Sequence, residues 1–161
     1  MNFNPKRHRA AYIETEHLVP QRILIVEDNA INMRLLDSLM QTQGFETILS
    51  IDGTDTLELA HDHHPDLIIL DSALPYLSGV EIVQMLKRDS TLAHIPVIAM
   101  TAYAKLADEG KFRGKGFDGY LAKPVSALDI LNTVAGLIGS PAPSHTAEVI
   151  PLNAGGQSAS A

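Results

Sequence analysis

The sequence predicts one α/β domain, a doubly wound parallel sheet of five strands with helices on both faces. Short apolar runs alternate with amphipathic stretches from Arg22 onward, which is the order of repeated βα units. The runs at 67–70 and 95–100 lack alternating polar residues, as expected for strands covered on both faces. Polar residues follow four of the runs, at the strand ends where open α/β sheets bind ligands.

The first repeat consists of a strand at 22–26 and a helix at 30–43. We expect the helix to begin after Asn29, a good N-cap residue, and to end at Gly44. Its apolar side chains recur at near-helical spacing, so one stripe of them should face the sheet. The residues expected in this inward stripe are Ile31, Leu35, Leu39 and Met40. The residues expected on the exposed face, beside the acidic pair that precedes the helix, are Asn32, Met33 and Leu36.

The remaining elements continue the alternation as far as Ile138. The further predicted strands are 45–50, 67–70, 95–100 and 117–121. The further predicted helices are 54–62, 78–88, 104–114 and 126–138, of which 104–114 is the most polar. The apolar residues expected to face inward from the last helix are Ile130, Leu131, Val134, Leu137 and Ile138.

Both ends of the chain lack this pattern. Residues 1–21 are polar and irregular, with proline at two positions, and residues 140–161 are rich in Ser, Pro, Ala and Gly. We therefore expect a folded domain at 22–139 between two flexible tails.

The composition excludes several classes of function. A net charge of −7 opposes non-specific binding to DNA or to anionic membranes. The absence of cysteine excludes disulfides, thiolate metal sites and a cysteine nucleophile. No apolar run approaches the roughly 18 residues of a membrane span, so we expect a cytoplasmic protein.

The polar residues after the strands form one constellation. Glu27 and Asp28 follow the first strand, Asp71 the third, Thr101 the fourth and Lys123 the fifth. If the strands are neighbours, three carboxylates, one hydroxyl and one ammonium meet in one crevice. Clustered carboxylates require a cation, and an all-oxygen ligand set is typical of Mg²⁺. With Mg²⁺ and Lys123 holding a phosphoryl group, the Asp71 carboxylate can attack phosphorus while Thr101 donates to another oxygen.

Taken singly, these residues have simpler explanations. The adjacent acids Glu27 and Asp28 are also favourable at a helix N-terminus, and Asp71 can cap the turn that follows it. The Lys123-Pro124 pair is typical of a turn, and its peptide bond can be cis. A second metal site is conceivable at His61, His63 and His64, although histidines at a helix end usually contact only water and the helix dipole.

The sequence resembles the receiver domain of two-component response regulators from about residue 22 to 138. The strings that carry the resemblance are ILIVEDN (23–29), LIILDSALPYLSG (67–79), IPVIAMTA (95–102) and GYLAKP (119–124). The resemblance implies a (βα)₅ flavodoxin-like fold and an Asp71 that accepts a phosphoryl group from a histidine kinase or phosphotransfer protein.

The resemblance also implies roles for the other residues of the site. The implied magnesium ligands are Glu27, Asp28, Asp71 and the main-chain carbonyl of Ala73. Lys123 is implied to contact the phosphoryl group, and Thr101 and Tyr120 are the implied hydroxyl and aromatic switch residues. Without the resemblance, Tyr120 is better explained as an ordinary half-buried strand aromatic with its hydroxyl in water.

The leading hypothesis is therefore a single-domain response regulator of the cell-fate, cell-cycle type, which signals by phosphorylation-dependent binding to a downstream protein. It is not an enzyme with a separate substrate, since it catalyses its own phosphorylation and slow dephosphorylation. One alternative is an aspartate-nucleophile phosphatase of haloacid dehalogenase type, but Ala73 stands where that class has a general acid. Another is a scaffold of the same fold that is never phosphorylated. We expect no direct binding to nucleic acid or membrane.

Overall fold

A computed structural model describes residues 19–102 and 112–140. It contains a five-stranded parallel sheet in the order β2-β1-β3-β4-β5. This order is doubly wound, the class of sheet that the sequence predicts. The strands are β1 (Arg22–Val26), β2 (Glu46–Ser50), β3 (Leu67–Asp71), β4 (Val97–Thr101) and β5 (Gly119–Ala122). The helices are α1 (Ala30–Thr42), α2 (Thr56–His63), α3 (Gly79–Arg88) and α5 (Ala127–Ile138).

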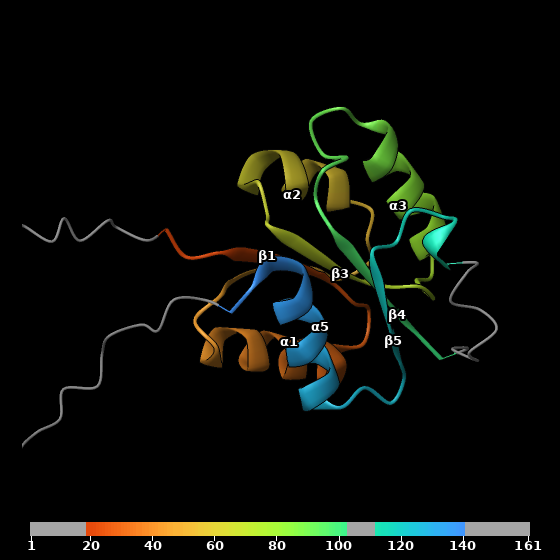
Figure 1. The fold of residues 1–161 in the computed structure, drawn as a ribbon. Helices are drawn as coiled ribbons and strands as arrows, with labels where there is room; N and C mark the ends of the chain where they lie inside the picture. The colour runs from red at the N-terminus through yellow and green to blue at the C-terminus, as the bar shows by residue number, and fades with distance from the viewer. Residues whose placement is uncertain (1–18, 103–111, 141–161) are drawn as a thin grey trace, which may run out of the picture.

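The helices form two layers around the sheet. Helices α1 and α5 lie on one face, below the sheet in Figure 1, and α2 and α3 lie on the other. Most of the predicted helix at 104–114, and the bulk of both predicted tails, fall outside the described residues. Gln21, assigned from the sequence to the N-terminal tail, donates a side-chain hydrogen bond of 2.9 Å to the carbonyl of Ile138.

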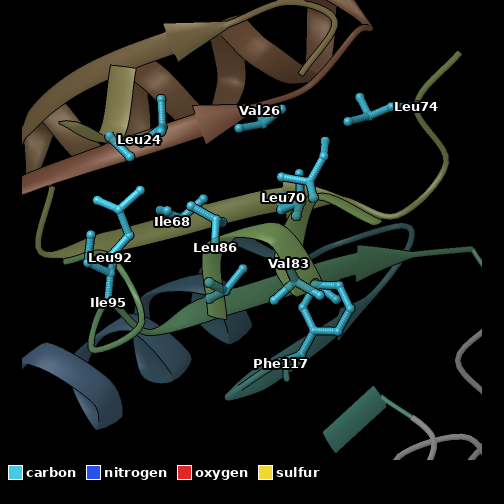
Figure 2. Close-up of a cluster of buried hydrophobic side chains, with 14 residues drawn as sticks. Leu24, Val26, Ile68, Leu70, Leu74, Val83, Leu86, Leu92, Ile95 and Phe117 are labelled. Carbon is cyan, nitrogen blue, oxygen red and sulfur yellow. The ribbon is translucent and has the colours of Figure 1, made fainter. Parts of the chain in front are cut away.

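The core is divided by the sheet into two apolar clusters. Successive residues of β1 alternate between them, with Leu24 and Val26 facing α2 and α3 and Ile23 and Ile25 facing α1 and α5. Figure 2 shows the cluster on the α2 and α3 side. All residues of β3 and β4 are buried, which explains why their sequences lack polar alternation.

Helix α1 begins and ends as predicted. The Asn29 side chain accepts hydrogen bonds from the backbone N–H groups of Ile31 and Asn32, at 2.9 and 3.1 Å. Gly44 has a φ of 93°, the left-handed conformation that favours glycine after a helix.

The predicted inward stripe of α1 is wrong in part. Ile31 and Leu35 are 77% and 59% exposed, whereas the buried residues of the helix are Met33, Leu36 and Met40. The helix carries two overlapping apolar stripes at near-helical spacing, so the periodicity fits either rotation about the helix axis. The stripe of α5 is correct: Ile130 and Val134 are buried, and the three partly buried residues packed beside them are Leu131, Leu137 and Ile138.

Among the described residues, no helix combines the length and the apolar character needed to cross a lipid bilayer.

Candidate functional site

The strand order brings the predicted site residues to one edge of the sheet. Strand β3 is hydrogen-bonded to β1 on one side and to β4 on the other, and β5 follows β4. In this register Asp71 pairs with Met100, one residue before Thr101, and Thr101 pairs with Ala122, one residue before Lys123. The carboxyl ends of β1, β3, β4 and β5 therefore surround a single crevice, as expected for an open α/β sheet.

Three carboxylates meet in this crevice. Glu27, Asp28 and Asp71 each contribute an oxygen that lies within 4.8 Å of the others. Glu27 and Asp71 are 1% and 3% exposed, whereas Asp28 is open to solvent. Within the described part of the chain this is the one group of three or more such side chains close enough to share a metal ion. Like charges this close repel each other, so positive charge nearby stabilises the cluster.

The Asp71 carboxylate is held at both oxygens. Oδ1 accepts a hydrogen bond of 3.0 Å from the backbone N–H of Ala73. Oδ2 accepts one of 2.7 Å from the ammonium group of Lys123. The side chain is therefore fixed in the crevice and is not directed into the hydrophobic interior.

Glu27 has one satisfied and one unsatisfied oxygen. Oε1 accepts a hydrogen bond of 3.0 Å from the backbone N–H of Asn29. Oε2 is buried with no hydrogen-bond donor among the described residues, and the Lys123 ammonium lies 3.5 Å away as an ion-pair partner. Burial raises the pKa of Glu27, and the negative charge of Asp71 raises it further. A buried, incompletely paired carboxylate oxygen beside two more carboxylates fits a divalent cation with oxygen ligands.

Lys123 supplies the positive charge of the site. Burial alone would lower its pKa, but the hydrogen bond and the attraction to Asp71, aided by Glu27, outweigh burial and raise the pKa. Lys123 is therefore an ammonium ion at neutral pH. Its backbone N–H donates to the Thr101 carbonyl at 2.8 Å, and its bond to Pro124 is cis, the isomer that the sequence allowed.

The two predicted switch residues lie on neighbouring strands. Thr101 is buried at the end of β4, and Tyr120 on β5 pairs with Ala99 and packs against the cluster on the α2 and α3 side. Thr101 lies two residues after Ala99 of that cluster, and alternate residues of a strand face the same side of the sheet. Both switch residues therefore lie on the α2 and α3 side. Their movement during signalling stays a prediction.

Gly79, the first residue of α3, was expected from the sequence only as part of the turn after Asp71 and of the string that carries the resemblance. A Cβ atom at this position would lie 2.7 Å from the Asp71 carbonyl oxygen and 2.8 Å from the Ser72 Cα. Since both neighbours are backbone atoms, only glycine lets the helix approach the Asp71 segment this closely. The sequence offers one sign of this role. Gly79 stands in the first turn of a helix whose start is already stabilised by a capping box of Ser78 and Glu81, so the glycine is not needed to begin the helix.

The second metal site considered from the sequence does not form. His61 pairs with Asp89 at 2.9 Å, and no set containing His61, His63 or His64 is among the metal-competent groups of the described residues. These histidines lie at the carboxyl end of α2, as the simpler interpretation expects.

Comparison with known proteins identifies the family. A family model described as the response regulator receiver domain matches residues 23–135. The chain belongs to the response regulator receiver family. It is similar to the polar-differentiation response regulator DivK of Brucella anthropi, with 43% identity over 121 residues that cover 75% of this chain and 98% of the relative. The protein of the same name from Brucella ovis is 44% identical over 117 residues, which cover 73% of this chain and 95% of the relative.

Solved receiver structures agree with this assignment. A receiver domain of a sensor histidine kinase from Pseudomonas aeruginosa, solved with magnesium in its active-site cleft, is 30% identical with a TM-score of 0.68. The alignment covers 76% of this chain and all of that domain. The chemotaxis protein CheY4 of Vibrio cholerae is 23% identical with a TM-score of 0.70, covering 74% of this chain and all of that one, and it supports the fold.

Membership of the receiver family indicates the broad function of the chain. The chain is a response regulator receiver similar to the DivK proteins, a signalling component of a two-component system. The alternative of a haloacid dehalogenase-type phosphatase finds no support in the family match or in these structures.

Proposed function

We propose that Asp71 is the phosphoacceptor of this receiver and that phosphorylation controls its binding to a downstream protein. The observation that carries the proposal is the position of the Asp71 carboxylate, 2.7 Å from the Lys123 ammonium and within 4.8 Å of oxygens of two further carboxylates. This arrangement places a nucleophilic oxygen where cations can offset the charge that develops during phosphoryl transfer.

Phosphoryl transfer to Asp71 exchanges one bond to phosphorus for another. An oxygen of the Asp71 carboxylate forms a bond to phosphorus while the bond between phosphorus and the donor histidine nitrogen breaks. The bonding electron pair stays on the histidine, and Asp71 becomes a mixed anhydride. Lys123 shifts its hydrogen bond from Asp71 to a phosphoryl oxygen, and the Thr101 hydroxyl donates to another. Hydrolysis of the anhydride later restores the carboxylate, so the protein also limits the lifetime of its own signal.

Mg²⁺ is the cation that we propose for the carboxylate cluster. Its ligands would be Asp28, Asp71 and the Ala73 main-chain carbonyl, with Glu27 acting directly or through a water molecule. When bound, Mg²⁺ neutralises charge on the phosphoryl oxygens. Support comes from the unsatisfied Glu27 oxygen and from the magnesium-bound receiver structure described above.

The proposed phosphoryl donor is a cytoplasmic histidine kinase or phosphotransfer protein that docks a helix beside the crevice. Two large apolar residues of α1, Ile31 and Leu35, are exposed there. Leu35 also lines a cavity of about 500 Å³, whose other lining residues include Lys123, Val125 and Ile130. This surface replaces the one predicted from the sequence, because Met33 and Leu36 are buried.

The output of the proposed switch is a protein surface. Thr101, drawn toward the phosphoryl group, would vacate space that Tyr120 can fill, and the altered surface would bind the downstream target. A role in cell-fate or cell-cycle control is part of the proposal and rests on the relatives named as polar-differentiation regulators.

The decisive experiment compares phosphorylation of wild type and Asp71→Asn. Acetyl phosphate or a phosphorylated kinase, with Mg²⁺, should label wild type and leave Asp71→Asn unlabelled. Asp62→Asn, which alters an exposed acid on α2, is the matched control and should be labelled normally. Equal labelling of wild type and Asp71→Asn would refute the proposal, and partner binding that ignores Asp71→Asn would favour the unphosphorylated scaffold.

A further inference from the structure

We propose that Gly53 and Leu74 form a positioning contact that fixes the Asp71–Ala73 turn in the geometry needed to bind the cation. Neither residue is a proposed ligand of the cation or a reacting group, so both are positioning residues. The inference rests on the proposed function, since it assigns Ala73 a place in the cation site.

Gly53 lies in the β2–α2 turn and has no room for a side chain. Its φ is +81°, and a Cβ atom would lie 2.7 Å from Leu74 Cδ1 and 2.8 Å from Ile82 Cδ1. Ile82 is completely buried, whereas Leu74 lies at the edge of the same cluster. Leu74 therefore packs on the backbone of the turn, and both Leu74 and Ile82 would have to move to admit a larger residue at position 53. Leu74 is the less enclosed of the two and has more room to move.

The β2–α2 turn is held rigidly by its own hydrogen bonds. The Gly53 N–H donates to the buried Ser50 hydroxyl at 3.2 Å, and the buried Thr56 hydroxyl donates to the Gly53 carbonyl at 2.8 Å. The Ser50 hydroxyl in turn donates to the Asp55 carboxylate. These three hydrogen bonds make the β2–α2 turn a rigid surface on which the Leu74 side chain packs.

The β2–α2 turn contacts both segments that carry the acids of the site, the end of β1 and the segment after β3. The backbone N–H of Glu27 donates to the Ser50 carbonyl at 3.1 Å, which ties the end of β1 to the start of the turn. Leu74 follows Ala73, whose N–H donates to Asp71 Oδ1 at 3.0 Å and whose carbonyl is the proposed cation ligand. A displacement of Leu74 therefore moves the Ala73 peptide relative to the Asp71 carboxylate.

The same apolar cluster contains a matched control. In Figure 2, Leu74 lies at the Val26 and Leu70 end of the cluster, beside the carboxyl ends of the strands, whereas Leu92 lies at the opposite end with Ile95. Leu74 and Leu92 are 9% and 1% exposed. Truncation of either leucine removes the same buried atoms from the same cluster, and only one of the two supports the site.

The first experiment measures Mg²⁺ affinity of the purified full chain by titration. Leu74→Ala should weaken Mg²⁺ binding about tenfold, the effect typical of residues that orient metal ligands. Leu92→Ala should leave the affinity within about twofold of wild type, although it loses stability to a similar degree. Leu74→Val is the milder variant if Leu74→Ala fails to fold, and it should show an intermediate loss. Equal Mg²⁺ affinities of the leucine variants would overturn the inference.

A second readout needs no metal. Hydrogen exchange of the Ala73 amide reports directly on its bond to Asp71, and it should accelerate in Leu74→Ala beyond the acceleration seen in Leu92→Ala. Failure of wild type to bind Mg²⁺ would refute the proposed cation site, while the exchange measurement would still test the contact. Identical Ala73 exchange in the two variants would overturn the contact itself.

A double-mutant cycle tests the pairing of the two residues. Gly53→Ala alone should weaken Mg²⁺ binding because its methyl group displaces Leu74. In the Leu74→Ala background the clash with Leu74 Cδ1 is absent, while the close approach to Ile82 Cδ1 and the unfavourable φ of +81° remain. The further effect of Gly53→Ala on Mg²⁺ affinity should therefore be smaller than in wild type. Additive losses would show that Gly53 and Leu74 act independently and would contradict the inference.

Discussion

The ammonium of Lys123 donates a 2.7 Å hydrogen bond to the carboxylate of Asp71, although 52 positions separate these residues in the sequence. The same ammonium lies 3.5 Å from the buried Oε2 of Glu27. One lysine thus offsets part of the charge of two buried carboxylates before any cation binds. Its contribution to stability and its contribution to phosphoryl transfer can therefore be measured on one variant.

Lys123→Met should destabilise the metal-free protein by about 1–2 kcal/mol, because it leaves two carboxylates without their cationic partner while keeping the apolar stem. Phosphorylation by acetyl phosphate should slow about 100-fold, since a preorganised positive charge is lost from the phosphoryl side. Mg²⁺ binding should persist. The measurements are urea unfolding, phosphorylation kinetics and Mg²⁺ titration, with Lys115→Met as the control at an exposed lysine. Loss of Mg²⁺ binding in Lys123→Met would contradict this division of roles.

The Lys123 contribution to stability should also depend on pH. Because folding raises the pKa of Lys123 above its ordinary 10.5, the contribution is fully present below pH 10.5 and is lost as the pH rises through the folded value. The difference in unfolding free energy between wild type and Lys123→Met should stay constant near neutrality and shrink in strong alkali. A difference that shrinks between pH 6 and 8 instead would assign the effect to another group.

Glu27→Gln should stabilise the metal-free protein at neutral pH by about 1 kcal/mol, because it removes a buried charge that Asp71 repels. Folding raises the pKa of Glu27, so the folded state binds its proton more tightly than the unfolded state. The cost of the charge therefore disappears as the pH falls through the folded value toward the ordinary 4.5, and the advantage of Glu27→Gln should vanish with it. Chemical unfolding at several pH values checks this expectation.

Saturating Mg²⁺ should reverse the order of stability of the two proteins. Wild type gains stability from the bound cation, whereas Glu27→Gln binds it more weakly and gains less. If Glu27→Gln remains the more stable protein at every Mg²⁺ concentration, Glu27 does not take part in cation binding.

The site was predictable because its residues follow directly from the sheet topology. Each of Asp71, Thr101 and Lys123 ends an apolar run, and parallel strands align such ends regardless of side-chain detail. The rotation of α1 was not predictable, since the stripes that contain Ile31 and Met33 are both apolar. The role of Gly53 was also hidden, because its constraint comes from Leu74, a residue of another turn that only the fold brings near.

Leu35→Asp should block phosphoryl transfer from the cognate kinase or phosphotransfer protein. The exposed Leu35 borders the apolar cavity beside Lys123, and a charge there would have to be desolvated when a partner helix docks. Labelling by acetyl phosphate should continue, because this small donor needs no docking surface. Leu128→Asp introduces the same charge at a similarly exposed leucine of α5 and should leave both reactions unchanged. Equal loss of transfer in Leu35→Asp and Leu128→Asp would argue against a specific docking surface on α1.

His64→Gly should stabilise the protein by about 0.5–1 kcal/mol without altering phosphorylation. His64 ends α2 in the left-handed conformation, at φ 47° and ψ 61°, and its N–H donates to the Ala60 carbonyl at 3.0 Å. A Cβ atom is unfavourable in this conformation, and glycine adopts it without that penalty. His64 precedes β3 at the end opposite Asp71, so the crevice should be unaffected. Thermal or urea unfolding measures the gain, and His64→Ala, which keeps the Cβ atom, should not show it. An equal gain from alanine would assign the strain to the imidazole and not to the backbone.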